Sequence, residues 1–355
     1  MNRRPFALDL RTPLTTAAGT IRQREGDLVR IDGGVGEATP LPGWTESLAD
    51  CRAALDSVGA VDDAAILDAA ADDPRDPLAA APTAATDPLA DAPAARHAVE
   101  SAALDAVGRC EDRSLSRLLA DADPAATVPV NATLGDAPPD ETVTAAIEAV
   151  DAGFDCLKVK VGVGDLDRDV TRLRTVRAAV GSDVELRADA NAAWDRETAR
   201  EAVDAFATLG LSYLEQPLPA GDLSGHAALR GRGVDIAVDE TLATTTVDGA
   251  LNADAADVLI LKPMVLGGPA RTHAAARRAR TAGVEPVVTT TVDAAPARTA
   301  AVHVAAAVPD VRPCGLATGT TLANDLAPDP APVEAGAVSV PTGPGIAGDA
   351  FDHLF

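Results

Sequence analysis

Residues Cys156–Gly162 read CLKVKVG, a short apolar run in which two lysines alternate with aliphatic residues. This alternation is typical of a β-strand, because successive side chains of a strand point to opposite faces. Lys158 and Lys160 therefore share one face of the predicted strand. The 355-residue chain has only one other lysine, Lys262, so 27 of its 30 lysines and arginines (30 minus 3) are arginines.

The rarity of lysine indicates a chemical role for the three that are present. Arginine stays protonated at any usable pH, whereas a buried lysine can lose its proton and act as a base. The alternative is that Lys158 and Lys160 share a strand by chance and that Lys262 only extends from the core toward solvent. The ordered acidic residues on the neighbouring predicted strands favour the chemical role.

Strands and helices alternate regularly around this segment. From VPVNATLG to a short final strand at Pro313–Ala317, apolar stretches are separated by helical segments such as Arg196–Leu209, with a β/α period of about 25 residues. This pattern predicts an α/β protein whose catalytic domain, residues 126–326, is a (β/α)7β TIM-like barrel. The alternative is a doubly wound open sheet, but no glycine-rich fingerprint follows the first strand.

The first 125 residues follow a different pattern. Short strands and turns up to about residue 50 precede alanine-rich helical stretches. The Pro-, Ala- and Asp-rich tract 72–94 is expected to be an exposed loop. These features predict an α+β capping domain over residues 1–125. The Pro- and Gly-rich residues 327–355 are expected to pack back on it.

The composition is strongly acidic, with a formal net charge of −24 and a sequence pI near 4.4. An acidic surface repels nucleic acid and anionic membrane, so we expect neither as a partner. Abundant Asp with almost no lysine is typical of halophilic proteins, whose surface repulsion is screened by concentrated salt. The alternative is a disordered acidic chain, but 47% hydrophobic residues and the regular β/α alternation argue against it.

The cysteines and the hydropathy predict a reduced, soluble, cytoplasmic protein. The four cysteines are far apart and form no CxxC pair, which favours free thiols over disulfides or a zinc site. The start of the chain has no sustained apolar run, and no segment has the roughly 18 uninterrupted apolar residues of a membrane span.

Polar residues interrupt the predicted strands near their carboxyl ends, the rim where a barrel carries its active site. A single acid at such a position is more often a cap or an ion-pair partner. Five positions separated by 29, 26, 24 and 23 residues, each from the next β/α unit, instead favour one site. In chain order these positions are Lys158 with Lys160, Asp189 with Asn191, Glu215 with Gln216, Asp239 with Glu240, and Lys262.

Three carboxylates on one rim repel one another unless a cation lies between them. Oxygen ligands without His or Cys favour Mg²⁺, with Mn²⁺ as the other candidate, over zinc. A lysine near that cation has a lowered pKa and can take a proton from carbon. A substrate carboxylate on the cation would stabilise the resulting enediolate, so the pattern predicts a small-molecule carboxylate as substrate.

These residues resemble the enolase superfamily, in its muconate-lactonising subgroup, where a KxK strand, three acidic metal ligands and a later lysine occupy these barrel strands. GVGEATPLPG at Gly34–Gly43 and AARHAVESAALDA at Ala94–Ala106 resemble the capping-domain and hinge signatures of the subgroup, and PVNATLG resembles its first barrel strand. The resemblance covers nearly the whole chain and implies a Mg²⁺-dependent barrel enzyme.

Within the subgroup, the chain is most similar to the o-succinylbenzoate synthases, the dehydratases of menaquinone biosynthesis. VVTTTVDAAPAR at Val287–Arg298 and CGLATGTTLANDL at Cys314–Leu326 carry this resemblance, although the usual Ser-Ser/Thr and Glu-Ser of the first segment are Thr-Thr and Asp-Ala here. Dipeptide epimerases have Asp-x-Asp on the eighth strand, where this chain has Leu-Ala-Thr. N-acylamino-acid racemases share nearly all of these motifs. Racemisation or cycloisomerisation therefore stays open, and a non-catalytic acidic scaffold is a remote third alternative.

The resemblance implies a role for each residue. Lys160 would remove the α-proton, with Lys158 beside it, and Lys262 would act from the opposite face, as a stabilising cation in a dehydratase or as a second acid/base in a racemase. The metal ligands would be Asp189, Glu215 and Asp239, with Asn191 and Glu240 in support. The substrate contacts, unless they are ordinary strand-end residues, would be Thr289, Thr290, Gly315 and Leu316.

The resemblance also implies a lid. The N-terminal loop Leu14–Arg24 would lie over the barrel mouth and exclude water. Arg22 or Arg24 would pair with a succinyl carboxylate of the substrate, or would be an ordinary surface arginine on a flexible loop.

Overall fold

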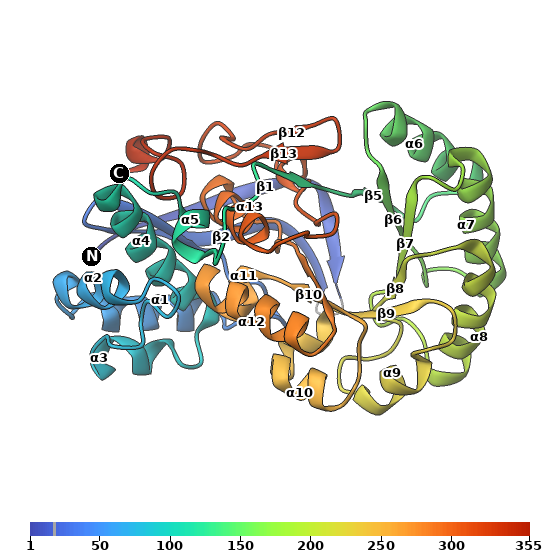
Figure 1. The fold of residues 1–355 in the computed structure, drawn as a ribbon, viewed down its shortest axis with the longest axis horizontal. Coiled ribbons are helices and arrows are strands. Elements are labelled where there is room, and N and C mark those ends of the chain that lie inside the picture. The colour runs from blue at the N-terminus through green and yellow to red at the C-terminus, as the bar shows by residue number, and fades with distance from the viewer. Residues whose placement is uncertain (17–18) are drawn as a thin grey trace.

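A computed structural model describes residues 1–16 and 19–355 and shows an antiparallel sheet with helices beside a parallel, helix-covered sheet (Figure 1). The antiparallel sheet consists of β1 (Asn2–Thr16), β2 (Gly19–Ile31) and β3 (Gly34–Ala38). The helices α1 (Leu48–Val58) and α2 (Asp63–Asp72) follow it. Both chain ends lie on this side of the molecule. Among the described residues, no helix combines the length and apolar character needed to cross a bilayer.

Two glycines of the GVG motif allow the sheet to pack closely on α4 (Pro93–Glu111). A Cβ at Gly34 would collide with the carbonyl oxygen of Ala102, and a Cβ at Gly36 would collide with that of Ala98. The alanines of α4 are small enough to match this approach, and Ala98 and Ala102 are fully buried. Close packing of small residues therefore takes the place of the large aromatic side chains that are rare in this sequence.

The parallel sheet has the strand order β11-β10-β9-β8-β7-β6-β5, as predicted for a (β/α) barrel. Its strands are β5 (Ala132–Leu134), β6 (Cys156–Lys160), β7 (Glu185–Asp189), β8 (Tyr213–Glu215), β9 (Asp235–Val238), β10 (Val258–Leu261) and β11 (Glu285–Val288). The helices between and after them are α6 (Pro139–Asp151), α7 (Leu166–Val180), α8 (Arg196–Phe206), α9 (Leu223–Leu229), α10 (Val247–Asn252), α11 (Pro263–Leu266), α12 (Pro269–Thr281) and α13 (Ala295–Ala307).

The predicted eighth strand, Pro313–Ala317, contacts both edges of this sheet without forming a regular strand. Cys314 forms a parallel bridge with Val130, just before β5, and Gly315 forms one with Thr289, just after β11. The backbone N–H of Cys314 donates to the carbonyl of Pro129 at 2.8 Å. This segment therefore joins the first and last strands, and the (β/α)7β barrel with a capping α+β unit is confirmed.

The C-terminal residues extend back from the barrel to the antiparallel unit. β13 (Ala337–Ser339) pairs with β12 (Val333–Glu334) and with β4 (Thr127–Pro129). Further on, the backbone N–H of Ile346 donates to the buried Asp105 of α4 at 2.7 Å, and its carbonyl lies 2.6 Å from the ring of His303. The exact division of the chain at residue 125 stays a prediction.

The prediction of an exposed loop over residues 72–94 is wrong. The segment contains the short helix α3 (Thr83–Thr86) and the 3₁₀ turn η1 (Asp87–Leu89). Leu78 and Leu89 are buried in the core around α1 and α4. The Pro and Asp residues interrupt regular secondary structure, but the Leu and Ala side chains between them have enough apolar surface to pack against the core.

The four cysteines are free, as predicted, and three of them are buried.

Candidate active site

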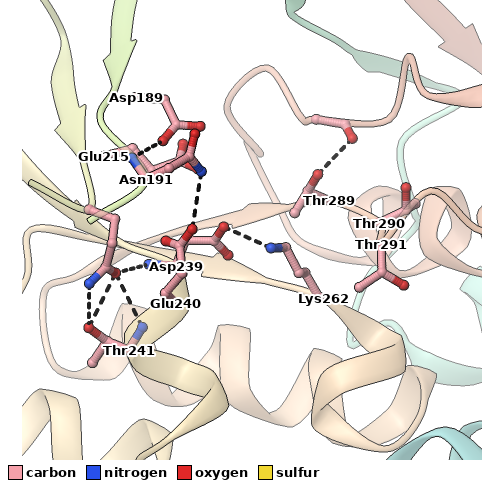
Figure 2. Close-up of polar contacts among 12 residues, drawn as sticks. Asp189, Asn191, Glu215, Asp239, Glu240, Thr241, Lys262, Thr289, Thr290 and Thr291 are labelled. Atoms are coloured by element: carbon pink, nitrogen blue, oxygen red, sulfur yellow. Dashed lines mark hydrogen bonds and ion pairs between the residues drawn. The ribbon is translucent and has the colours of Figure 1, made fainter. Parts of the chain in front are cut away.

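The carboxyl ends of the barrel strands bring the predicted lysines and acids together. Figure 2 shows the acids with one of the lysines, Lys262. In the parallel register, Lys160 lies opposite Asp189, and Asp189 lies opposite Glu215. Asp239 directly follows β9, and Lys262 directly follows β10. The predicted positions, one on each successive strand, therefore meet at one end of the barrel.

Lys158 joins two of the three acids. Its Nζ lies 3.1 Å from both carboxylate oxygens of Glu215 and 3.1 Å from Oδ2 of Asp189. Burial opposes the charged form of Lys158, but the two carboxylates outweigh burial and raise the pKa of Lys158 well above its usual value. This direction is the opposite of the lowered pKa expected for a lysine beside a cation, because the nearest charges here are negative.

Lys160 is the more accessible lysine of β6. Its Nζ donates to Oδ2 of Asp189 at 2.6 Å and to Oδ1 of Asn191 at 2.7 Å. Its side chain is 32% exposed, against 14% for Lys158. A small molecule at the barrel mouth can therefore reach Lys160 more readily than Lys158, which suits the predicted role of proton acceptor.

Lys262 approaches the same site from β10, four strands away from β6 in the sheet. Its Nζ donates to Oδ2 of Asp239 at 2.7 Å. The same nitrogen lies 3.4 Å from the ring centroid of Trp44, which comes from the antiparallel unit. Because Lys262 is only 11% exposed, its ammonium group is largely removed from water.

Asn191 and Glu240 link the acids laterally. The backbone N–H of Asn191 donates to Oδ1 of Asp189 at 3.1 Å, and its side-chain Nδ2 donates to Oε1 of Glu240 at 3.1 Å. Asn191 has φ of 45°, a left-handed conformation that asparagine tolerates better than most residues. The turn after β7 therefore holds the Asn191 side chain between Lys160 and Glu240.

Gln216 and Thr241 form a buried contact that we did not predict. Gln216 Oε1 accepts from the backbone N–H of Asp239 at 2.8 Å, and its Nε2 donates to Oγ1 of Thr241 at 2.9 Å. Gln216 is completely buried and has φ of 41°. Its side chain thus fixes the backbone that carries Asp239. The sequence signal was the polar pair Glu215-Gln216, whose second member had no assigned role.

Burial and mutual repulsion shift the pKa values of the three acids in different directions. Burial, with the charge of Asp189, raises the pKa of Glu215 to about 7. Burial also raises the pKa of Asp239 to about 6, against the opposing effect of Lys262. Burial acts the same way on Asp189, but Lys160 and Lys158 outweigh it and lower the pKa of that carboxyl. The two lysines therefore favour the charged form of Asp189.

The oxygen atoms of this site suit a hard divalent cation. Asp239 Oδ1 and Glu240 Oε2 are buried and accept no hydrogen bond from a described residue, an unfavourable arrangement for carboxylate oxygens. Within residues 1–16 and 19–355, no three His, Cys, Asp or Glu side chains are gathered closely enough to hold an ion as they stand. Lysine ammonium groups contact all three acids instead. The all-oxygen donor set and the unpaired oxygens fit Mg²⁺ or Mn²⁺.

The predicted substrate-contact residues lie beside one another between β11 and the eighth segment. Thr289 Oγ1 donates to the carbonyl of Gly315 at 2.8 Å, and Thr290 Oγ1 lies 2.9 Å from Oγ1 of Thr318. A Cβ at Gly315 would lie 2.5 Å from Thr289 Oγ1, so a larger residue there would force the Thr289 side chain to move. Leu316 is 1% exposed. The two threonine hydroxyls are thus engaged with the eighth segment, and contact with substrate stays a prediction for all four residues.

The predicted lid loop Leu14–Arg24 is, in its described part, the paired end of the β1–β2 hairpin. Ala17 and Ala18 lie outside the described residues. Arg24 is neither a substrate ligand nor a surface residue, because it is 2% exposed and donates to the carbonyls of Thr39, Pro40 and Val292. Arg22 is exposed on β2. The prediction for Arg24 is therefore wrong, since its partners come from segments that the local sequence does not reveal.

Comparison with known proteins supports the same family. Residues 141–349 match the enolase C-terminal domain-like family. The chain is 37% identical over 209 residues to an o-succinylbenzoate synthase of Thermobifida fusca, covering 58% of this chain and 63% of that protein. It is 33% identical over 222 residues to a hydrophobic dipeptide epimerase of Enterococcus faecalis, covering 60% of each. The matched segment thus spans somewhat less than two thirds of either relative.

A solved structure extends the likeness to the whole chain. The dipeptide epimerase of Enterococcus faecalis V583, complexed with Mg and the dipeptide L-Leu-L-Tyr, superposes with a TM-score of 0.83 at 26% identity and covers 98% of both chains. The family match extends over more than half of the sequence, and the lysines and acids that suggested the family lie together at the barrel mouth. The chain therefore belongs to the enolase superfamily of enzymes, in its muconate-lactonising subgroup.

Proposed function

We propose that this enzyme is an o-succinylbenzoate synthase, a hydro-lyase of menaquinone biosynthesis in the cytoplasm. The reaction removes water from 2-succinyl-6-hydroxy-2,4-cyclohexadiene-1-carboxylate and gives o-succinylbenzoate. Identity to the synthase of Thermobifida fusca supports the proposal, although identity to epimerases is similar. The choice between these activities therefore depends on the site itself.

The observation that carries the choice is the lack of a carboxylate on the eighth segment. A dipeptide has a free α-ammonium group, which needs an anionic partner when it is removed from water. Here the segment presents the buried Leu316, then Ala317, then Thr318, whose hydroxyl contacts Thr290. The nearby acid Asp325 is paired with Arg298 at 3.1 Å. This lining suits an uncharged part of a substrate better than an ammonium group.

Lys160 is the proposed base. It takes the proton from C1, the ring carbon that bears the carboxylate, and the electron pair of that C–H bond passes into the carboxylate as an enediolate. The pair then forms a ring double bond as the C6–O bond breaks. Because both events occur on one face, Lys160 returns the proton to the departing hydroxyl, which leaves as water. Lys158 and Lys262 remain cations at the carboxylate throughout.

The proposed cofactor is Mg²⁺, which the superposed epimerase structure contains, with Mn²⁺ as a substitute. Asp189, Glu215 and Asp239 would hold it, and Asn191 and Glu240 would support them. When bound, the cation supplies positive charge beside the substrate carboxylate. The two unpaired buried oxygens, Asp239 Oδ1 and Glu240 Oε2, are the observation behind this assignment.

An ultraviolet assay that follows loss of the cyclohexadiene tests the proposal. We expect turnover in molar KCl with Mg²⁺ and loss of turnover after treatment with EDTA. Readdition of Mg²⁺ should restore it. No turnover under these conditions, with folded protein shown by circular dichroism, would remove the assignment.

N-acylamino-acid racemisation is a second candidate, because Lys262 offers a lysine on the opposite side of the site from Lys160. Exchange at the α-carbon of an N-succinylamino acid in D₂O separates the two activities. A dehydratase should leave the recovered amino acid nearly unlabelled and unracemised. A racemase should introduce deuterium into both enantiomers.

A further inference from the structure

Trp44 is an aromatic residue that contacts a lysine of the site, and it does not come from the barrel. It lies in the segment after β3, and its ring centroid is 3.4 Å from the Nζ of Lys262. This is well inside the roughly 6 Å within which a cation is attracted to the face of an aromatic ring. The attraction is stronger when the cation is desolvated, and Lys262 is 11% exposed.

The contacts of Lys262 differ from those of the other two lysines. Lys158 contacts two carboxylates, and Lys160 contacts a carboxylate and an amide oxygen. Among the described residues, Lys262 Nζ has one hydrogen-bond acceptor, Asp239, and the face of Trp44. The indole therefore takes the position that a second acceptor occupies at the other lysines, without adding another negative charge to a site already rich in carboxylates.

A tight turn in the backbone places Trp44 beside Lys262. The sequence Leu41-Pro42-Gly43-Trp44 has a proline at the second position and a glycine with φ of 84° at the third. The N–H of Trp44 donates to the carbonyl of Leu41 at 3.0 Å. These are the features of a type II β-turn, in which proline presets φ and glycine accepts the positive φ. The direction of the indole is therefore built into the backbone.

Both ends of this segment are anchored. On one side, Arg24 donates to the carbonyl of Thr39 at 2.7 Å and to that of Pro40 at 3.1 Å. On the other side, the carboxylate of Glu46 accepts from the backbone N–H groups of Ala94 and Ala95 at 3.1 and 2.9 Å. The turn is thus fixed before any ligand binds.

We propose that Trp44 is a positioning residue for Lys262. Its indole face, held by the Pro-Gly turn, keeps the Lys262 ammonium on the side of the site opposite Lys160. A residue of the antiparallel unit thereby sets the position of the Lys262 ammonium group in the barrel. This role goes beyond the proposed function. Of the two tests below, only the kinetic one rests on the proposed dehydration.

Tryptophan fluorescence tests the contact without any assay of activity. The chain has two tryptophans, so Trp194→Phe leaves Trp44 as the single reporter. In this background, Lys262→Met should change the emission maximum of Trp44. The matched control Lys160→Met, which removes a different site cation, should leave it unchanged. No change with Lys262→Met, or the same change with both variants, would overturn the proposal.

Kinetics test the consequence of the contact and depend on the proposed dehydration. Trp44→Leu keeps apolar bulk but removes the aromatic face, and should lower kcat about 5- to 30-fold with little change in KM. Trp44→Phe keeps an aromatic face and should restore most of the lost rate. Equal losses in both variants, or an unchanged kcat in Trp44→Leu, would overturn the positioning role. If neither the parent nor any variant dehydrates the substrate, the proposed function is wrong. The fluorescence experiment still tests whether Trp44 contacts Lys262.

Discussion

Lys160 and Asp189 are direct partners across β6 and β7, and their side chains meet at the carboxyl ends of those strands, where Nζ lies 2.6 Å from Oδ2. A shift of β6 by one residue against β7 would turn the side chain of Lys160 to the other face of the sheet, away from Asp189. The pairing of β6 with β7 therefore fixes the position of the proposed base.

Replacement of that lysine by arginine is the sharpest test of the mechanism. Lys160→Arg keeps the positive charge beside Asp189 but cannot release a proton near neutral pH. Turnover should fall at least 10²- to 10⁴-fold, the usual contribution of a general base. Thermal melting and Mg²⁺ binding by calorimetry should change little. Near-normal dehydration in this variant would show that another group removes the proton.

Lys262→Arg should separate the two candidate activities. A cation that only stabilises negative charge can be replaced in part by a guanidinium group, whereas a proton donor cannot. We expect this variant to retain measurable dehydration and to lose racemisation of an N-succinylamino acid. Both activities should be measured on the same preparation. Retained racemisation would exclude Lys262 as the second acid/base.

Arg24 should be important for stability rather than for substrate affinity. It donates to three backbone carbonyls from two parts of the chain. Arg24→Met would leave these acceptors without their donor and should lower the free energy of unfolding by about 2–5 kcal/mol. Arg22→Met, at an exposed position two residues earlier on β2, is the matched control and should melt like the parent. Comparable melting of the two variants would contradict the buried role.

Glu100 should make stability depend on pH. Burial raises the pKa of this carboxyl from 4.5 to about 7, although Arg96 and the backbone N–H of Ala270 favour its charged form. The folded state therefore binds this proton more tightly than the unfolded state. Its contribution to stability is fully present below pH 4.5 and is lost as the pH rises through 7.

Because of Glu100, the free energy of unfolding should fall by up to about 1.4 kcal/mol per pH unit between pH 4.5 and about 7. Glu100→Gln cannot ionise and should remove that part of the slope when denaturant unfolding is followed from pH 4.5 to 8. Glu111→Gln, on the exposed end of the same helix, is the matched control for loss of a carboxylate. A slope that persists in Glu100→Gln would assign the effect to other groups.

Salt should stabilise the fold. At a formal charge of −24, self-repulsion is large at low ionic strength. Raising KCl from 0.1 M to 1 M shortens the Debye length from about 10 Å to about 3 Å, so Tm should rise over that range. Sucrose, which is uncharged, is the control for general solvent exclusion. A flat Tm would mean that arginine pairs such as Arg278 with Asp248 already neutralise the surface.

The barrel and its lysines and acids were predictable because they depend on short-range rules. Alternation with period 2 places Lys158 and Lys160 on one face, and regular β/α spacing places Asp189 and Glu215 on successive strand ends. Arg24 and Trp44 followed no such rule. One partner of each, Val292 for Arg24 and Lys262 for Trp44, lies more than 200 residues away along the chain, so only the folded structure reveals these contacts.

The return of the C-terminal residues to the antiparallel unit has a consequence for biosynthesis. Ile346 completes the surroundings of Asp105 and His303, and Arg4 near the start of β1 donates to the carbonyl of Leu354. The ribosome adds these residues after the barrel strands, so the antiparallel unit, which is made earlier, lacks these contacts until they emerge. Until residues 346–354 emerge, the apolar surface that they cover is exposed in the nascent chain. The strongly acidic sequence should reduce aggregation during this time, because like charges repel one another.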